Sequence, residues 1–252
     1  MIHGWPDTLR LWDGTVEALK DRWRCVRFTL PGFEPGAPQR SAVPLDTLRA
    51  QIASVIDEAS PDRPVTLLLH DWGCFFGYQF AMRHPQRVER VIGVDIGDIG
   101  SRHHRAELTA KAMVGTVAYQ WWLALAWRLG GPLGDRMARW MARRFRAPAP
   151  AGQIGASMGY PYAMAWFGVA GGFGRPRAFQ PTVPMLFIHG ERKPFPFHSA
   201  AWAQRIAGQP ASQVLGLPTG HWVMTQRPAE FHAAVRQWLE ATDDLPAVGI
   251  TR

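Results

Sequence analysis

A short segment in the first third of the chain carries the residue best placed to do chemistry. The sequence Leu67-Leu68-Leu69-His70-Asp71-Trp72-Gly73-Cys74 joins an apolar run, typical of a buried strand, to a helical segment. A tight strand-to-helix turn exposes its central residue above the sheet. Here that residue is Asp71, whose carboxylate would be kept ionised by the free N–H groups at the helix start. The pattern indicates a nucleophile that needs no base, with a simple helix cap as the alternative.

Two further motifs lie where partners of such a nucleophile are expected. His3-Gly4-Trp5-Pro6 precedes the first helix, and Gly220-His221-Trp222 follows the last predicted strand. His221 could activate a water molecule as a general base. A carboxylate that attacks an sp³ carbon bearing an epoxide oxygen or a halide forms a stable alkyl ester, whereas attack on an ester would give an anhydride. These residues therefore favour the opening of a carbon–heteroatom bond.

The order of these motifs resembles the α/β-hydrolase superfamily over residues 1 to about 240. The pairing of HGWP with HDWG is similar to its epoxide hydrolase and haloalkane dehalogenase branch, in which Asp is the nucleophile and Trp follows it. The resemblance implies that the backbone N–H groups of Trp72 and Trp5 form the oxyanion hole, and that no cofactor or metal is needed. The reaction we expect opens an epoxide of a small apolar substrate. A haloalkane dehalogenase and a non-catalytic ligand-binding homologue are the alternatives.

The acid that orients His221 departs from the usual pattern. The resemblance implies Gly-x-x-Asp after the strand at 183–189, but the chain has Gly190-Glu191-Arg192-Lys193, and a lysine cannot orient an imidazolium. Some relatives carry the acid after the strand that follows the nucleophile's helix, and Asp95, 24 residues after Asp71, matches that position. Asp98 and Glu191 are the competing acids. Asp95 could also be an ordinary strand-end residue.

Aromatic residues between Ile99 and Gln180 are candidates for substrate binding. In epoxide hydrolases such tyrosines hydrogen-bond the epoxide oxygen, which points to Tyr160 or Tyr162, with Tyr119 as a further candidate. In dehalogenases indole N–H groups hold the halide, a role open to Trp72 and Trp166. Plain packing of these rings is the alternative.

These residues are positioned by alternating strand-like and helical segments. The alternation predicts an α/β-hydrolase fold, with a mostly parallel sheet, helices on both faces and a helical lid. The strands that should precede HGWP are missing, so we expect an exposed edge on the strand at 65–69. The predicted domains are a core at 1–98 and 181–241, a lid at 99–180 and a tail at 242–252. Strands are predicted at 24–30, 65–69, 88–95, 183–189 and 212–217, and helices at 45–59, 74–83, 199–207 and 228–241.

Composition excludes several other classes of protein. Two cysteines are too few for a disulfide framework, and the start MIHGWPDT is not a signal peptide, so a cytoplasmic location is expected. The net charge of +8 reflects 25 arginines beside three lysines, and it does not indicate nucleic-acid binding. The arginines are scattered apart from a modest cluster at Arg136, Arg139, Arg143, Arg144 and Arg146. The apolar run 112–129 contains Gln120 and four aromatics, which favours a buried or pocket-lining helix over a membrane span. Peripheral membrane contact stays open, and a monomer or homodimer is expected.

Overall fold

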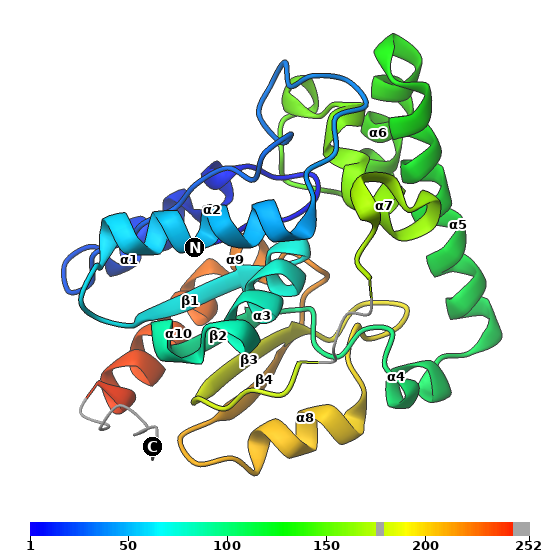
Figure 1. Ribbon diagram of the computed structural model, residues 1–252. Helices are drawn as coiled ribbons and strands as arrows, with labels where there is room; N and C mark the ends of the chain where they lie inside the picture. The colour runs from blue at the N-terminus through cyan, green and yellow to red at the C-terminus, as the bar shows by residue number, and fades with distance from the viewer. Residues whose placement is uncertain (175–178, 244–252) are drawn as a thin grey trace.

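Four parallel strands form the centre of the computed structural model, which describes residues 1–174 and 179–243 (Figure 1). They are β1 (Val65–His70), β2 (Val88–Val94), β3 (Met185–Gly190) and β4 (Gln213–Leu217), and they lie side by side in that order. In the register, Leu67 pairs with Val91, and Val91 pairs in turn with Met185. The prediction of a parallel α/β sheet is confirmed.

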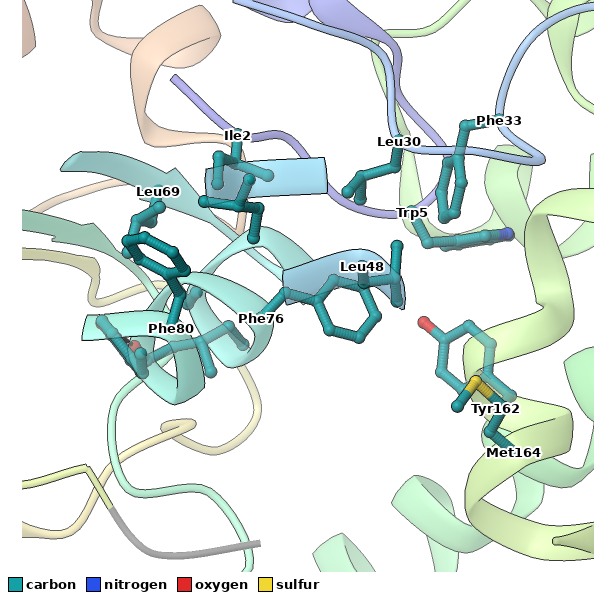
Figure 2. Packing of buried hydrophobic residues seen from close by; sticks show 14 of the residues in the cluster. Ile2, Trp5, Leu30, Phe33, Leu48, Leu69, Phe76, Phe80, Tyr162 and Met164 are labelled. Atoms are coloured by element: carbon teal, nitrogen blue, oxygen red, sulfur yellow. Dashed lines mark hydrogen bonds between the residues drawn. The ribbon is translucent and has the colours of Figure 1, made fainter. Parts of the chain in front are cut away.

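Helices cover both faces of this sheet because its strands alternate their side chains between two apolar cores. Leu67 and Leu69 point to one face, where they pack with residues such as Phe76 (Figure 2). Leu68 and Ile92 point to the other face. The first face is covered by α2 (Leu45–Ala59), α3 (Trp72–Arg83) and α8 (Ala200–Ala207), and the second by α1 (Asp13–Leu19), α9 (Val223–Gln226) and α10 (Pro228–Thr242).

A helical insertion separates β2 from β3. It contains α4 (Arg102–Glu107), α5 (Ala110–Leu129), α6 (Gly131–Phe145) and α7 (Tyr160–Phe167), joined by short turns. The expectation that the apolar run 112–129 is buried or pocket-lining is wrong for one side of α5, where Val114 and Trp121 are exposed. Within the described residues, no helix is both long enough and apolar enough to span a membrane. The domain boundaries stay predictions.

The segment 24–30, predicted as a strand, forms no regular secondary structure. A strand requires a continuous row of backbone partners. Here the chain alongside consists of residues 1–3, whose contacts are the Met1 amino group donating to the Val26 carbonyl (2.7 Å) and the Leu30 N–H donating to His3 Nε2 (2.9 Å). The residues of this segment favour a strand, but the row of backbone hydrogen bonds that a strand needs is not formed.

Residues 1–3 also lie against β1, in the place of a neighbouring strand. Ile2 forms a parallel bridge with Leu69: its N–H donates to the Leu68 carbonyl (2.9 Å), and its carbonyl accepts from the His70 N–H (3.0 Å). The expected bare edge of β1 is therefore covered at the end next to Asp71. Most of the predicted tail, 244–252, lies outside the described residues.

Candidate active site

Asp71 lies in the turn between β1 and α3 with an unusual backbone conformation. Its φ of 51° and ψ of −123° are unfavourable for a residue with a side chain. Close packing holds the turn: a Cβ on Gly4 would come within 2.3 Å of Asp71 Oδ1, and one on Gly73 within 2.3 Å of the Ile2 carbonyl oxygen. The Asp71 side chain forms no helix-capping hydrogen bond. This argues against the cap alternative.

Backbone N–H groups from two segments converge on the Asp71 carboxylate. The Trp5 N–H donates to Asp71 Oδ1 at 2.6 Å, and the Trp72 N–H stabilises the same carboxylate. Burial opposes ionisation of Asp71, but the hydrogen bond and charge of His221, together with the Trp72 N–H, outweigh it and hold the pKa of Asp71 below its ordinary value. The predicted oxyanion donors thus both face the predicted nucleophile.

His221 lies between two carboxylates. It follows β4, and its Nε2 is 3.4 Å from Asp71 Oδ2 while its Nδ1 is 2.5 Å from Asp95 Oδ2. Burial would lower the pKa of His221, but hydrogen bonds to Asp71 and Asp95, and their charges, raise it to about 9. The three side chains form a continuous line from the predicted nucleophile to the predicted base and the predicted acid.

Asp95 is positioned by the end of β2 and by a neighbouring strand. It is fully buried, has a φ of 70°, and accepts a hydrogen bond from the Gly190 N–H at 2.9 Å through Oδ1. The other two candidate acids lie elsewhere. Asp98 accepts from the Ser199 N–H (2.7 Å) and from two hydroxyl groups, and Glu191 lies exposed over Gly216 of β4.

Lys193 is a part of this site that sequence reasoning missed. Its Nζ donates to Asp95 Oδ1, its side chain is only 7% exposed, and it lies 4.7 Å above the Phe197 ring. Burial opposes ionisation of Asp95, and the charges of Lys193 and His221 overcome this and lower its pKa. The available signal was that a buried lysine in place of an acid requires a nearby carboxylate.

Two tyrosines of the insertion face Asp71. The Tyr119 and Tyr162 rings are 6.1 Å apart, and Tyr162 packs 5.1 Å from Trp72. The Tyr162 ring is also 6.2 Å from the Trp5 ring, as Figure 2 shows. Burial raises the pKa of Tyr119 to about 12, and the Asp71 charge adds to this effect. The pKa of Tyr162 is also well above its ordinary value, by burial and then by the charge of Asp71. Both phenols therefore stay protonated.

The other two aromatic candidates pack against other residues. Tyr160 packs against Phe33 (ring centroids 5.8 Å), and its buried hydroxyl has no hydrogen-bond partner among the described residues. Trp166 donates its indole N–H to Gln120 Oε1 at 3.1 Å and is 37% exposed. The structure brings Tyr119 and Tyr162 together, and neither Tyr160 nor Trp166 joins them.

A separate pocket of about 490 Å³ lies at the far end of α3 from Asp71. Ala81, Met82 and Phe179 are among its lining residues, none of which is ionisable.

Comparison with known proteins gives one family match and several relatives. The model of the alpha/beta hydrolase fold family matches residues 1–149. A probable oxidoreductase, EphD, from Mycobacterium tuberculosis is 36% identical over 93 residues, covering 36% of this chain and 16% of EphD. Epoxide hydrolase 1 of Caenorhabditis elegans is 28% identical over 106 residues, covering 41% of this chain and 26% of the relative. The matches thus span well under two thirds of these relatives.

Two solved structures show the same fold over nearly the whole chain. A putative epoxide hydrolase from Pseudomonas aeruginosa has a TM-score of 0.71 at 18% identity and covers 96% of this chain and 88% of its own. A haloalkane dehalogenase loop variant from Bradyrhizobium elkanii has a TM-score of 0.66 at 16% identity, with the same coverage of 96% and 88%. At these identities the likeness establishes the fold alone.

Proposed function

The chain belongs to the alpha/beta hydrolase fold family, and we propose that it is an epoxide hydrolase that acts through a covalent ester on Asp71. The observation that carries the proposal is the line of side chains from Asp71 through His221 to Asp95, joined by an ion pair at 3.4 Å and a hydrogen bond at 2.5 Å. The similarity of the chain's sequence to a relative named an epoxide hydrolase supports the same class of reaction.

In the first step Asp71 attacks an epoxide carbon and the carbon–oxygen bond breaks. The lowered pKa of Asp71 keeps its carboxylate ionised, as a nucleophile requires. The raised pKa values of Tyr119 and Tyr162 keep both phenols protonated, as a proton donor requires. One of the two phenols donates its proton to the leaving epoxide oxygen. This pair replaces the expected pair of Tyr160 and Tyr162, because Tyr160 packs against Phe33 instead.

The second step hydrolyses the ester, and the first step prepares His221 for it. In the free protein His221 is protonated at neutral pH, because ionised Asp71 and Asp95 raise its pKa to about 9. Conversion of Asp71 to a neutral ester removes one of these charges, so the pKa of His221 falls and His221 releases its proton to solvent, while the phenolate left by the first step takes up a proton from solvent. His221 can then accept a proton from the attacking water, while the Trp5 and Trp72 N–H groups hold the developing oxyanion.

The surroundings of Asp71 indicate an apolar, aromatic substrate. The Trp72 ring packs 5.5 Å from Phe173 and 5.1 Å from Tyr162, and Tyr119 packs 5.3 Å from Phe145. Rings around a small number of polar groups are typical of sites that bury apolar ligands. A small aryl epoxide fits this chemistry.

Product analysis tests the proposal against its alternatives. The protein is incubated with styrene oxide and, separately, with 1-bromobutane, and diol and bromide are measured. We expect diol from the epoxide, and none from the Asp71→Asn variant, which keeps the shape of the side chain. Bromide without diol would assign the dehalogenase alternative. Neither product, from protein that is folded by circular dichroism, would leave the non-catalytic homologue.

A further inference from the structure

The outer side of the helical insertion exposes large apolar residues. All ten exposed large hydrophobic residues of the described chain lie between Met113 and Trp166. On α5, Val114, Val117, Trp121 and Leu125 recur at helical spacing and are 69, 39, 45 and 40% exposed. Buried residues such as Leu123 lie on the opposite side of the same helix. The helix therefore packs with one apolar side and presents another to the surroundings.

This exposed side continues across neighbouring helices. Trp121 of α5 contacts Trp166 of α7 (ring centroids 5.8 Å), and Trp122 of α5 contacts Trp140 of α6 (5.0 Å). On α6, Leu133 and Trp140 are 56 and 48% exposed. Figure 1 shows α5 and α6 at the edge of the molecule, away from the sheet. We call this surface of α5 and α6 the outer face; it consists of Val114, Val117, Trp121, Leu125, Leu133 and Trp140.

The outer face lies in the most basic part of the chain. Between Ala110 and Phe167 there are seven basic residues and one acidic residue, so this segment carries a net charge of +6 against +8 for the whole chain. The acidic residue, Asp135, is turned inward and accepts a hydrogen bond from the Ala156 N–H at 2.7 Å. The exposed basic residues are Lys111, Arg128, Arg136, Arg143, Arg144 and Arg146.

Apolar and basic groups are arranged in a way that suits a lipid surface. Lys111 and Arg128 bracket a stretch of α5 with no charged residue, which is about 24 Å long at the usual helical rise. Exposed tryptophans favour the headgroup boundary of a bilayer, and basic residues favour anionic lipids. A second copy of the chain is the poorer partner, because two faces each inside a segment of net charge +6 would repel each other.

We propose that the outer face of α5 and α6 binds the surface of an anionic lipid bilayer, without any helix crossing it. The proposal is independent of the proposed chemistry, because binding can be measured without turnover. Such binding would place the helical insertion at the bilayer surface, where small apolar molecules such as the proposed substrates accumulate.

Vesicle co-sedimentation of the full chain tests this. The probes are vesicles of dioleoyl phosphatidylcholine alone and mixed with dioleoyl phosphatidylglycerol. We expect binding only to the anionic mixture, and release at high salt because surface charges are screened. The double variant Arg143→Glu/Arg144→Glu should lose at least about tenfold in partition coefficient. A matched control, Arg63→Glu/Arg205→Glu, makes the same change of charge on exposed core residues and should stay within about twofold.

A second variant guards against loss of folding. Trp121→Gln removes an exposed ring without changing charge and should weaken binding while leaving the circular dichroism spectrum unchanged. Three results would overturn the proposal: no binding to either vesicle, equal binding by the two double variants, or a dimer in light scattering that Trp121→Gln dissociates. The last result would assign the outer face to self-association.

Discussion

At the residue scale, the pairing of Asp95 with two cations is the least expected feature of the site. Asp95 Oδ2 contacts His221 while Oδ1 contacts Lys193 and the Gly190 N–H. The ammonium group of Lys193 competes with the imidazolium of His221 for the Asp95 carboxylate. Lys193 therefore weakens the hold of Asp95 on protonated His221, which makes the base form easier to reach.

Replacement of Lys193 tests this competition. In Lys193→Met, the pKa of His221 should rise, so the acidic limb of the pH profile of kcat should move to higher pH by about one unit. Lys193→Arg keeps the charge and should keep the profile. Asp71, Asp7 and His70 also face His221 and are unchanged in both variants. A Met variant with the wild-type profile would refute a role for Lys193 in setting this pKa.

At the element scale, the site depends on the close approach of the HGWP turn to the β1–α3 turn. Gly4 makes this possible, because a Cβ there would come within 2.4 Å of the Trp72 nitrogen. Gly4→Ala should push the Trp5 N–H away from Asp71 and lower kcat/KM by about a hundredfold or more. Gly14→Ala is the matched control: its Cβ would meet only the His232 ring at 3.6 Å, and alanine favours α1. Equal activity of the two variants would show that the turn does not position the donor.

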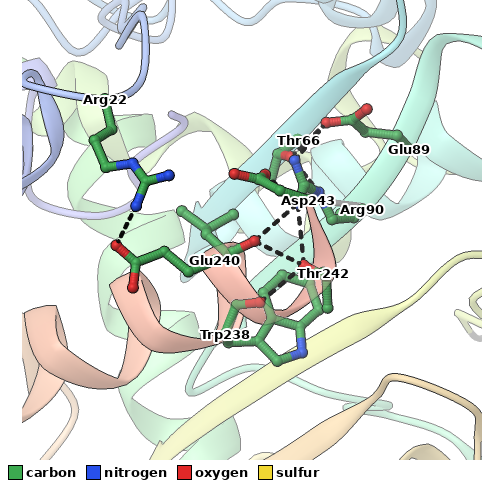
Figure 3. A network of polar contacts seen from close by, with 9 residues as sticks. Arg22, Thr66, Glu89, Arg90, Trp238, Glu240, Thr242 and Asp243 are labelled. Atoms are coloured by element: carbon green, nitrogen blue, oxygen red, sulfur yellow. Dashed lines mark hydrogen bonds and ion pairs between the residues drawn. The ribbon is translucent and has the colours of Figure 1, made fainter. Parts of the chain in front are cut away.

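A second element-scale contact joins the sheet to the end of α10. Arg90 of β2 is 9% exposed and donates to Thr66 (3.1 Å), Thr242 (3.0 Å) and Asp243 (2.9 Å), as Figure 3 shows. Arg90→Met leaves these buried acceptors without a donor. Urea denaturation should show a loss of about 2 to 4 kcal/mol in the free energy of unfolding.

An exposed ion pair nearby, also drawn in Figure 3, provides the control for the Arg90 measurement. Arg22 and Glu240 form an exposed ion pair at 2.9 Å, with side chains 53 and 39% exposed. Arg22→Met should cost less than about 1 kcal/mol. If the two losses were equal, burial of Arg90 would not be what gives the contact its strength.

Local sequence signals predicted most elements because each carries its own periodicity. The helix predicted at 45–59 matches α2, and the strand at 65–69 matches β1 to within one residue. The segment 24–30 failed because a strand depends on what lies beside it, which its own residues do not encode. Asp95 could be predicted because its spacing from Asp71 matches a position known in relatives. The contact of Lys193 with Asp95, 98 residues away in the sequence, could not be predicted, because it depends on the folded chain. The direction of Tyr160 depends on packing with Phe33 and was equally out of reach.

At the scale of the whole molecule, buried neutral histidines make stability depend on pH. Burial lowers the pKa of His3 to about 4, His70 to about 3 and His198 to about 4, from 6.5. Between pH 6.5 and 4 the unfolded chain binds these three protons and the folded chain does not, so stability falls as pH falls. Asp7 opposes this with one proton, because burial raises its pKa from 3.8 to about 7.

Burial likewise lowers the pKa of the Met1 amino group from 8.0 to about 5, which adds one proton. The net effect between pH 6.5 and 5 is an uptake of about three protons on unfolding, so about 4 kcal/mol of stability is lost per pH unit. Urea denaturation at pH 7.5, 6 and 5 measures it directly. An unfolding free energy that stays constant over this range would mean that these histidines are not held neutral in the fold.

Trapping the proposed covalent ester on Asp71 tests the mechanism most directly. His221→Gln removes the base for the second step and leaves the nucleophile in place, so the ester should accumulate. After incubation with styrene oxide, intact-mass spectrometry should show a gain of one epoxide molecule, located by peptide mapping at Asp71. The added mass should be absent from His221→Gln/Asp71→Asn. A folded His221→Gln protein that gains no mass while the wild type forms diol would contradict the account.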